Sequence, residues 1–115
     1  MTFQPEGELS AEEAGERVEE ALASEDVVLF MKGNRLMPQC GYSKRALELI
    51  SGHVEEFETV DVLPALPAYR EALEANSGWE TIPQTYVEGE FVGGSDVLAE
   101  LEERGELGDT LAGEA

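Results

Sequence analysis

Hydrophobic residues recur along the chain with two different periods, which divide it into helical and extended segments. In AEEAGERVEEALAS, residues 11–24, apolar side chains recur every three or four positions, and Ser10 with Glu13 forms a capping box at the start. This pattern predicts an amphipathic helix. VVLFM, from Val27 to Met31, is instead a continuous apolar run, which is typical of a strand buried on both faces.

The middle of the chain repeats this alternation of helix and strand. CGYSKRALELIS places apolar residues at helical spacing after Cys40, and Gly52 is a typical helix end. VEEFETVDV, residues 54–62, alternates between apolar and polar positions and predicts a second strand. Pro67 suits the first position of a short helix, PAYREALEA, which the residues NSG bring to an end.

The last third of the chain predicts a hairpin followed by a helix. QTYVEGEFVGG contains two short β-rich runs that meet at Glu88–Gly89. Ser95 or Asp96 then caps a helix that ends at Gly105. The first few residues and the tail from Gly108 are small and polar, so we expect them to be poorly ordered.

The expected order of elements is αβαβαββα, which indicates an α/β fold. The first strand–helix–strand unit should be a right-handed parallel crossover, and the last two strands an antiparallel hairpin. Together they give a mixed four-stranded sheet flanked by helices. The 115 residues are enough for one domain with a real core, which we place at about residues 10–107, with 108–115 as a tail.

The net charge of −19 narrows the choice of partners, because 26 acidic residues outnumber 7 basic ones. Such a surface repels phosphate backbones, so we expect no nucleic-acid partner. Concentrated salt would screen the self-repulsion, which favours a protein from a salt-accumulating organism, although an ordinary acidic protein also fits. The chain begins without a signal peptide and has no apolar run of about 18 residues, so we expect a cytoplasmic protein without a membrane partner.

The single cysteine is the main candidate for chemistry. Cys40 follows a polar loop and begins a helix, where unpaired N–H groups and the helix dipole lower the pKa of a thiol. The ammonium of Lys32, at the other end of the loop, could add to this effect. A buried and inert cysteine is the alternative, but the polar neighbours Gln39 and Ser43 do not resemble a core segment.

The number of cysteines limits what this thiol can do. Without a second cysteine, Cys40 can form a disulfide only with an outside thiol. It also cannot hold an iron–sulfur cluster alone, since such clusters typically take four sulfur ligands. Two chains would supply two sulfurs, and small thiols held beside each Cys40 would supply the others. Either chemistry therefore needs a pocket for a small thiol.

Two segments near the hairpin are candidates for that pocket. In TIPQT, Pro83 is a candidate cis-proline, which would leave the backbone of Ile82 free to pair with a peptide-like ligand; otherwise Pro83 simply begins an edge strand. In GGSD, two glycines before a helix can bind a carboxylate through backbone N–H groups, and Asp96 can accept an ammonium. By itself, GGSD is also compatible with an ordinary capped turn.

Three further residues have a functional and a plain interpretation. Trp79 could shield the site or simply pack against its neighbours, and Arg70 could reach a carboxylate or be an ordinary exposed arginine. His53 is expected to be a surface residue without a role. One His and one Cys give no support to a zinc site.

Taken together, the motifs resemble those of the monothiol, CGFS-type glutaredoxins, a branch of the thioredoxin fold. FMKG, the seven-residue loop to Cys40, CGYS, W-x-T-I-P-Q and GEFVGGSD occur in the order and spacing of that family. The resemblance covers roughly Glu25 to Leu107. Each motif alone is weak, but the set in register is specific.

The resemblance implies a role for each matching residue. Cys40 would be the nucleophile and the metal ligand. The small-thiol site would comprise Lys32, Arg70, Thr81, Ile82, Pro83, Gly94, Ser95 and Asp96. Lys32 and Arg70 would bind a carboxylate of the small thiol, which is normally glutathione. The TIP residues would line its cysteinyl part, with the proline in cis, and the GSD residues would bind its γ-glutamyl end.

The resemblance also implies a carrier of iron–sulfur clusters. Family members usually form dimers around a [2Fe–2S] cluster, held by two such cysteines and two glutathiones, and pass it to apo iron–sulfur proteins. The alternative is an enzyme that reduces mixed disulfides between proteins and a small thiol, and a third possibility is a redox-inert adaptor. The loop between Lys32 and Cys40 favours the carrier, because the dithiol glutaredoxins usually have a shorter one.

Three features depart from the family pattern. Tyr42 replaces the usual phenylalanine, Glu80 replaces a proline between Trp79 and Thr81, and the loop NRLMPQ keeps the family's length but not its sequence. An extreme halophile could also lack glutathione. In that case a related thiol such as γ-glutamylcysteine could serve, since the segment expected to bind the glutamyl group is intact.

Overall fold

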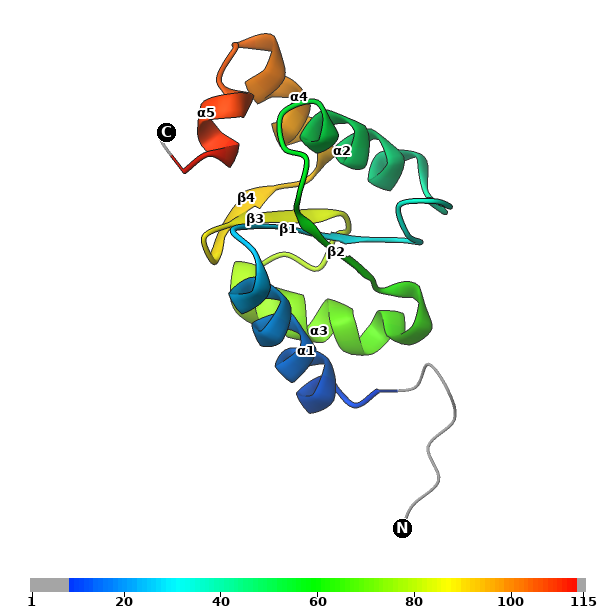
Figure 1. Cartoon of the computed structure of the whole chain (residues 1–115). Coiled ribbons are helices and arrows are strands. Elements are labelled where there is room, and N and C mark those ends of the chain that lie inside the picture. Colours follow the sequence, from blue (N-terminus) through cyan, green and yellow to red (C-terminus); the bar gives the residue numbers. More distant parts are fainter. Residues whose placement is uncertain (1–8, 114–115) are drawn as a thin grey trace.

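A four-stranded mixed sheet, in the order β2–β1–β3–β4, forms the centre of the computed structural model, which describes residues 9–113 (Figure 1). The strands are β1 (Val27–Met31), β2 (Glu58–Asp61), β3 (Gln84–Val87) and β4 (Glu90–Gly93). β1 runs parallel to β2 and antiparallel to β3, and β3 runs antiparallel to β4. The predicted mixed sheet is confirmed.

Helices cover both faces of this sheet (Figure 1). They are α1 (Ala11–Ser24), α2 (Gly41–Ser51), α3 (Leu66–Ser77), α4 (Ser95–Glu103) and α5 (Leu107–Leu111), with a short 3₁₀ helix at Leu63–Ala65. α1 and α3 lie on one face, and α2, α4 and α5 on the other. None of the helices within residues 9–113 is long and apolar enough to cross a membrane.

β1 is buried on both faces, as its continuous apolar run predicts. Val28 and Phe30 pack with α1 and α3, whereas Leu29 and Met31 pack with α2 and α4. Successive side chains of a strand point to opposite faces, so a strand between two helical layers needs apolar residues at every position. β1 therefore connects the two halves of the core.

β2 is shorter than the strand expected at residues 54–62. It pairs with β1 only from Val28 opposite Glu58 to Met31 opposite Asp61. Residues 54–57 instead lead the chain from α2 back to the sheet, and Phe57 is buried in the α2 side of the core. The alternating pattern of this stretch thus reflects a connection with one buried residue, Phe57, followed by a four-residue strand.

The expectation of a poorly ordered tail from Gly108 is wrong as far as Leu111, because helix α5 covers Leu107–Leu111. Leu107 and Leu111 are buried against α2 and α4. These two leucines lie one helical turn apart, so a single turn buries both. The first eight and the last two residues, also expected to be poorly ordered, lie outside the described part of the chain.

Candidate functional site

Cys40 lies at the N-cap of α2, as predicted. Its backbone is extended (φ −149°, ψ 134°), and its carbonyl accepts the first helical hydrogen bond from Lys44 N at 2.9 Å. The side chain is partly exposed and is the free thiol of the chain. A cysteine in this position has the first N–H groups of the helix next to its sulfur.

Those N–H groups lower the pKa of the Cys40 thiol. Partial burial acts against the thiolate, but the backbone N–H groups of Ser43 and Tyr42 favour it. The charge of Lys32 and the Ser43 side chain favour the thiolate further, so that the net shift of the pKa is downward. The predicted activation of the thiol by the helix start and by Lys32 is thus present in the geometry.

Ser43 has a structural role that sequence reasoning missed. Its side chain is fully buried, and its hydroxyl accepts a hydrogen bond from the backbone N–H of Lys32 at 3.0 Å. This contact joins the end of β1, where the loop begins, to the first turn of α2. Ser43 therefore fixes the backbone of Lys32 to the start of α2, and its hydroxyl also favours the Cys40 thiolate.

The loop between Lys32 and Cys40 folds back on itself. Gln39 N donates to the Lys32 carbonyl at 2.9 Å, and Gly33 forms an isolated bridge with Pro38. Gly33 has φ +91°, and a Cβ there would lie only 2.4 Å from the carbonyl oxygen of Met37. Only glycine fits this closed turn, which brings the two ends of the loop together.

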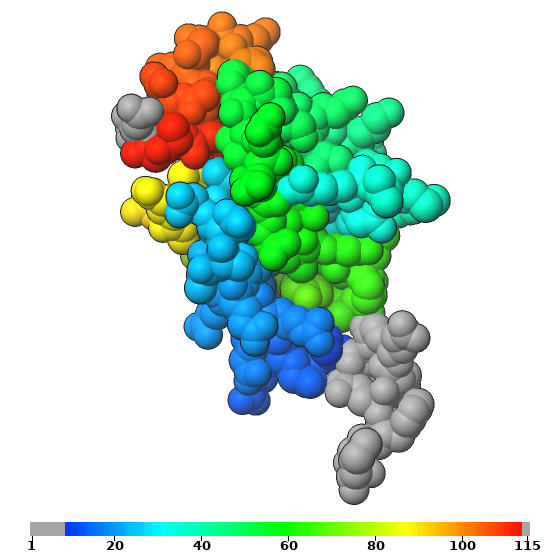
Figure 2. Space-filling model, in the orientation of Figure 1, coloured from blue at the N-terminus to red at the C-terminus, as the bar shows by residue number. Residues whose placement is uncertain are grey.

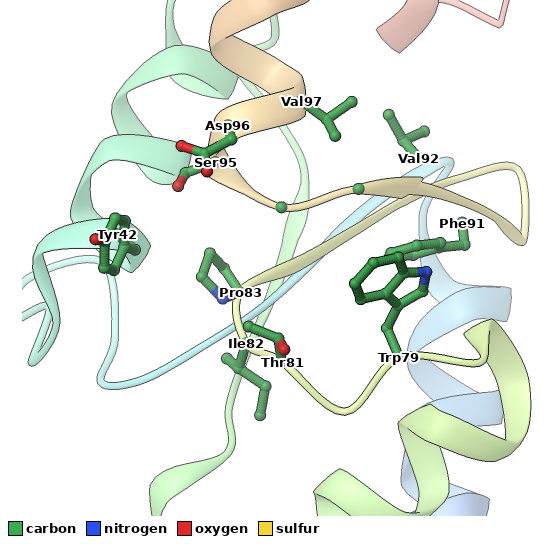
Figure 3. A pocket seen from close by; sticks show the side chains of 12 residues that line it. Tyr42, Trp79, Thr81, Ile82, Pro83, Phe91, Val92, Ser95, Asp96 and Val97 are labelled. Carbon is green, nitrogen blue, oxygen red and sulfur yellow. The ribbon is translucent and has the colours of Figure 1, made fainter.

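A pocket of about 500 Å³ lies next to the start of α2 (Figure 3). It is lined by Tyr42, Trp79, Thr81, Ile82, Pro83, Phe91, Val92, Gly93, Gly94, Ser95, Asp96 and Val97. Six residues predicted to bind the small thiol are among them, from both the TIP and the GSD segments. The Ile82–Pro83 peptide bond is cis, which agrees with the prediction.

The two segments of the pocket meet at Gly94. A Cβ on Gly94 would lie 3.1 Å from the carbonyl oxygen of Pro83, so glycine allows the close approach of the two chains. Gly94 is also the N-cap of α4, where no side-chain hydrogen bond caps the helix among the described residues. The first N–H groups of α4 are suited to an anion such as a carboxylate.

Other predicted site residues lie outside this pocket. Cys40 and Lys32 do not line it, although Tyr42, two residues after Cys40, does. Arg70 lies exposed on α3. Asp96 is already near a cation, since Arg45 Nη1 lies 3.6 Å from its carboxylate. Both side chains are more than half exposed, so this ion pair is weak and leaves Asp96 accessible.

A buried network around Gln84 supports one wall of the pocket. The amide nitrogen of Gln84 donates to the carbonyls of Trp79 (2.6 Å) and Thr81 (3.2 Å). Its amide oxygen accepts from the hydroxyls of Tyr86 (2.8 Å) and Ser77 (3.1 Å). Gln84 is fully buried, and a polar residue at the start of an apolar strand was the signal that could have indicated this role.

Glu80 and Trp79, which precede the TIP segment, are exposed, and His53 lies elsewhere. Glu80 lies on the surface beside the pocket, and Trp79 lines the pocket with 61% of its surface accessible. His53 contacts Glu102 at 3.0 Å, away from Cys40 in the sequence and fold. Within residues 9–113, no three side chains of His, Cys, Asp or Glu come together as a metal site.

Comparisons with known proteins identify the family of this chain. The glutaredoxin family model matches residues 27–92. An uncharacterized monothiol glutaredoxin of Synechocystis is 45% identical over 83% of this chain and 88% of its own length. A probable monothiol glutaredoxin of Legionella pneumophila is 49% identical over 70% and 89%. Human glutaredoxin-3 is 46% identical over 86% of this chain, which spans only 29% of that longer protein.

Solved structures agree with these sequence matches. The solution structure of reduced poplar apo GrxS14 has a TM-score of 0.75 and 35% identity, and the match covers 86% of this chain and 90% of that one. The 1CGrx1 of Trypanosoma brucei has a TM-score of 0.74 and 34% identity, over 99% and 84% of the two chains. With its single cysteine at the start of α2, the chain belongs to the monothiol branch of the glutaredoxin family.

Proposed function

We propose that the protein carries a [2Fe–2S] cluster in the cytoplasm and passes it to apo iron–sulfur proteins. The observation that carries this proposal is a single, accessible thiol whose pKa is lowered, placed next to a pocket of small-thiol size. A thiolate is the form of cysteine that binds iron. Because the chain has no second cysteine to form a disulfide with it, the Cys40 thiol is available to ligands from outside.

Four sulfur ligands require two chains and two small thiols. Each Cys40 would supply one sulfur, and each pocket would hold the thiol that supplies another, so the cluster-bound form would be a homodimer. The thiol would be held by Lys32, Arg70, Thr81, Ile82, Pro83, Gly94, Ser95 and Asp96. Lys32 lies beside the sulfur, which suits a carboxylate close to the cysteinyl group.

Anaerobic reconstitution with iron, sulfide and a small thiol tests this proposal. We expect visible absorption from the cluster, a dimer mass in solution, and transfer of the cluster to an apo-ferredoxin. Cys40→Ser should abolish all three, whereas Ser51→Ala, on the exposed end of the same helix, should change none. A colourless monomer of the wild-type protein under all such conditions would contradict cluster carriage.

The lowered pKa of Cys40 also supports a second function, reduction of mixed disulfides. The Cys40 thiolate would attack the small-thiol sulfur of a protein mixed disulfide, and the protein thiolate would leave and take up a proton. A second small thiol would then attack the new disulfide, which releases Cys40 and a disulfide of two small thiols. Fast turnover of an S-thiolated peptide that is lost in Cys40→Ser would favour this function over cluster carriage.

The small thiol is proposed to be glutathione or a relative such as γ-glutamylcysteine. The pocket residues that would hold the glutamyl end, Gly94 and Ser95, are the same for both thiols. Calorimetry with the two thiols distinguishes them. A clear preference for glutathione would remove γ-glutamylcysteine as the physiological ligand.

A further inference from the structure

Positive charge is concentrated around Cys40. Residues 27–47 contain no Asp or Glu, although the whole chain has 26 of them. The same stretch holds four of the seven basic residues, and the other three are scattered over α1, α3 and the end of α4. The basic residues of the stretch are Lys32, Arg35, Lys44 and Arg45. A molecule with a net charge of −19 thus has one acid-free, basic segment, and Cys40 lies within it.

Exposed hydrophobic side chains lie in the same segment. Leu36 is 93% exposed, Met37 64% and Tyr42 62%. Single exposed apolar residues are ordinary, but a group of them next to a reactive thiol is typical of a binding surface. Leu63 extends the group, because the Asp61 carboxylate accepts hydrogen bonds from both Gly33 N and Leu63 N at 3.0 Å.

The loop that presents these side chains is held in place. The side-chain oxygen of Asn34 accepts hydrogen bonds from Leu36 N and Met37 N, both at 2.9 Å. Arg35 lies with its guanidinium 4.0 Å from the centre of the Phe57 ring and donates to the Phe57 carbonyl. Figure 2 shows the segment, in cyan, projecting from the side of the molecule. A fixed loop loses little conformational freedom when a partner covers it.

The pocket does not account for this surface. Leu36, Met37 and Lys44 are absent from the residues that line it. A second copy of this chain, held only by this surface and not by a cluster shared between the two Cys40 side chains, would place like charges opposite one another, which costs free energy. A partner with carboxylates around an apolar patch would instead match both the charge and the hydrophobic residues.

We propose that Lys32, Leu36, Met37, Tyr42, Lys44 and Arg45, here called the loop surface, form the docking site for an acidic partner protein that brings its cysteine to Cys40. This rests on the proposed function only in that partners exchange sulfur ligands or disulfides at Cys40. The acidic remainder of the molecule would repel such a partner, so that the loop surface also orients it.

Two synthetic peptides test the docking site. Both carry a cysteine in mixed disulfide with 2-mercaptoethanol and the same leucines, one with flanking glutamates and the other with flanking lysines. Cys40 attacks the disulfide, a Cys40 mixed disulfide forms, and the displaced thiolate takes up a proton. The second-order rate constants are divided by the rate constant with the uncharged disulfide of 2-mercaptoethanol, which reports the intrinsic reactivity of Cys40.

We expect the glutamate peptide to react at least about tenfold faster in dilute salt, as electrostatic steering predicts. Lys44→Glu should abolish this preference. Arg104→Glu, which changes the net charge equally but lies at the end of α4, should retain it. Leu36→Ser with Met37→Ser should slow the glutamate peptide severalfold without changing the reaction of the uncharged disulfide.

Each alternative result has a definite meaning. Equal normalised rates for the two peptides, or a faster lysine peptide, would overturn the docking site and show that the overall acidity dominates. An equal loss of preference in Lys44→Glu and Arg104→Glu would overturn it too. Absence of reaction with the uncharged disulfide would instead contradict the reactive Cys40 of the proposed function, so the two failures are distinguishable.

Discussion

At the scale of single residues, Ser43 explains why the position three residues after Cys40 is polar. Its hydroxyl is completely buried and accepts the N–H of Lys32, while its own backbone N–H favours the Cys40 thiolate. A second thiol at this position would accept a hydrogen bond only weakly. The serine therefore connects the thiolate, the helix start and the nearby cation in one arrangement.

Ser43→Ala should destabilise the protein and weaken the thiolate. Loss of the hydroxyl leaves the Lys32 N–H without its acceptor, which costs about 1–3 kcal/mol of the free energy of unfolding. The pKa of Cys40 should rise, since the substitution removes a hydroxyl that favours the thiolate. Urea unfolding and thiol alkylation measure the two effects. Ser51→Ala is the control on the same helix, and an equal loss of stability there would contradict this role for Ser43.

The pH dependence of alkylation tests the activation of Cys40. A lowered pKa means that the thiolate is already abundant at a pH where an ordinary cysteine is protonated. The alkylation rate should therefore rise with pH and level off at a lower pH than for a free cysteine. Lys32→Met should move this midpoint upward, because the nearby positive charge is lost, whereas Arg104→Met should not move it. An unchanged midpoint in Lys32→Met would show that the helix N–H groups alone lower the pKa.

At the scale of elements, the turn before β3 depends on Gln84. Burial raises the pKa of Tyr86, which keeps its hydroxyl protonated and able to donate to the Gln84 oxygen. The Gln84 nitrogen holds the carbonyls of Trp79 and Thr81, which border the pocket. One buried side chain thus connects the end of α3, the pocket wall and β3.

Gln84→Glu is a nearly isosteric test of this connection. The carboxylate still accepts from Tyr86 but cannot donate to the two carbonyls, and burial of its charge adds to the cost. We expect a loss of about 2–4 kcal/mol in the free energy of unfolding and weaker binding of the small thiol. Unfolding curves and Trp79 fluorescence measure the change. Exposed Gln39→Glu is the control, and a wild-type Trp79 signal in Gln84→Glu would contradict the role in the wall.

Elements with a long local pattern could be predicted from the sequence, and those fixed by a few distant contacts could not. β1 was predicted residue by residue, because burial on both faces requires an unbroken apolar run. Helix α5 has only Leu107 and Leu111 as a pattern, and its burial depends on α2 and α4. Likewise Cys40 and the pocket segments have recognisable motifs, whereas the partners of Ser43 and Gln84 are seen only in the folded chain.

At the scale of the whole molecule, the acidic charge is spread over the helices and loops but is missing from residues 27–47, the sequence segment that contains Cys40. Glu16 and Glu19 of α1 and Glu71 of α3 line a shallow groove between these two helices. Carboxylates that line one groove repel, and the repulsion is strongest in dilute salt. These three carboxylates lie outside the pocket, whereas Asp96 lines it and Asp61 binds the loop that leads to Cys40.

Stability should consequently rise with salt. The screening length falls from about 10 Å at 0.1 M to about 3 Å at 1 M, so the repulsion among the carboxylates largely disappears. Removal of two charges by Glu19→Gln with Glu71→Gln should raise the free energy of unfolding by about 0.5–1 kcal/mol in dilute salt and by much less at 1 M. Thermal unfolding at both concentrations measures the difference.

Glu100→Gln provides the matched control, because this carboxylate is paired with Arg104 at 2.7 Å. Its neutralisation removes a negative charge and an attractive contact together, so we expect no gain in dilute salt. If Glu100→Gln stabilises the protein as much per removed charge as the double variant does, the net charge alone would govern stability. If only the groove pair stabilises, and only in dilute salt, then local crowding of carboxylates between α1 and α3 is the reason that this fold requires screening.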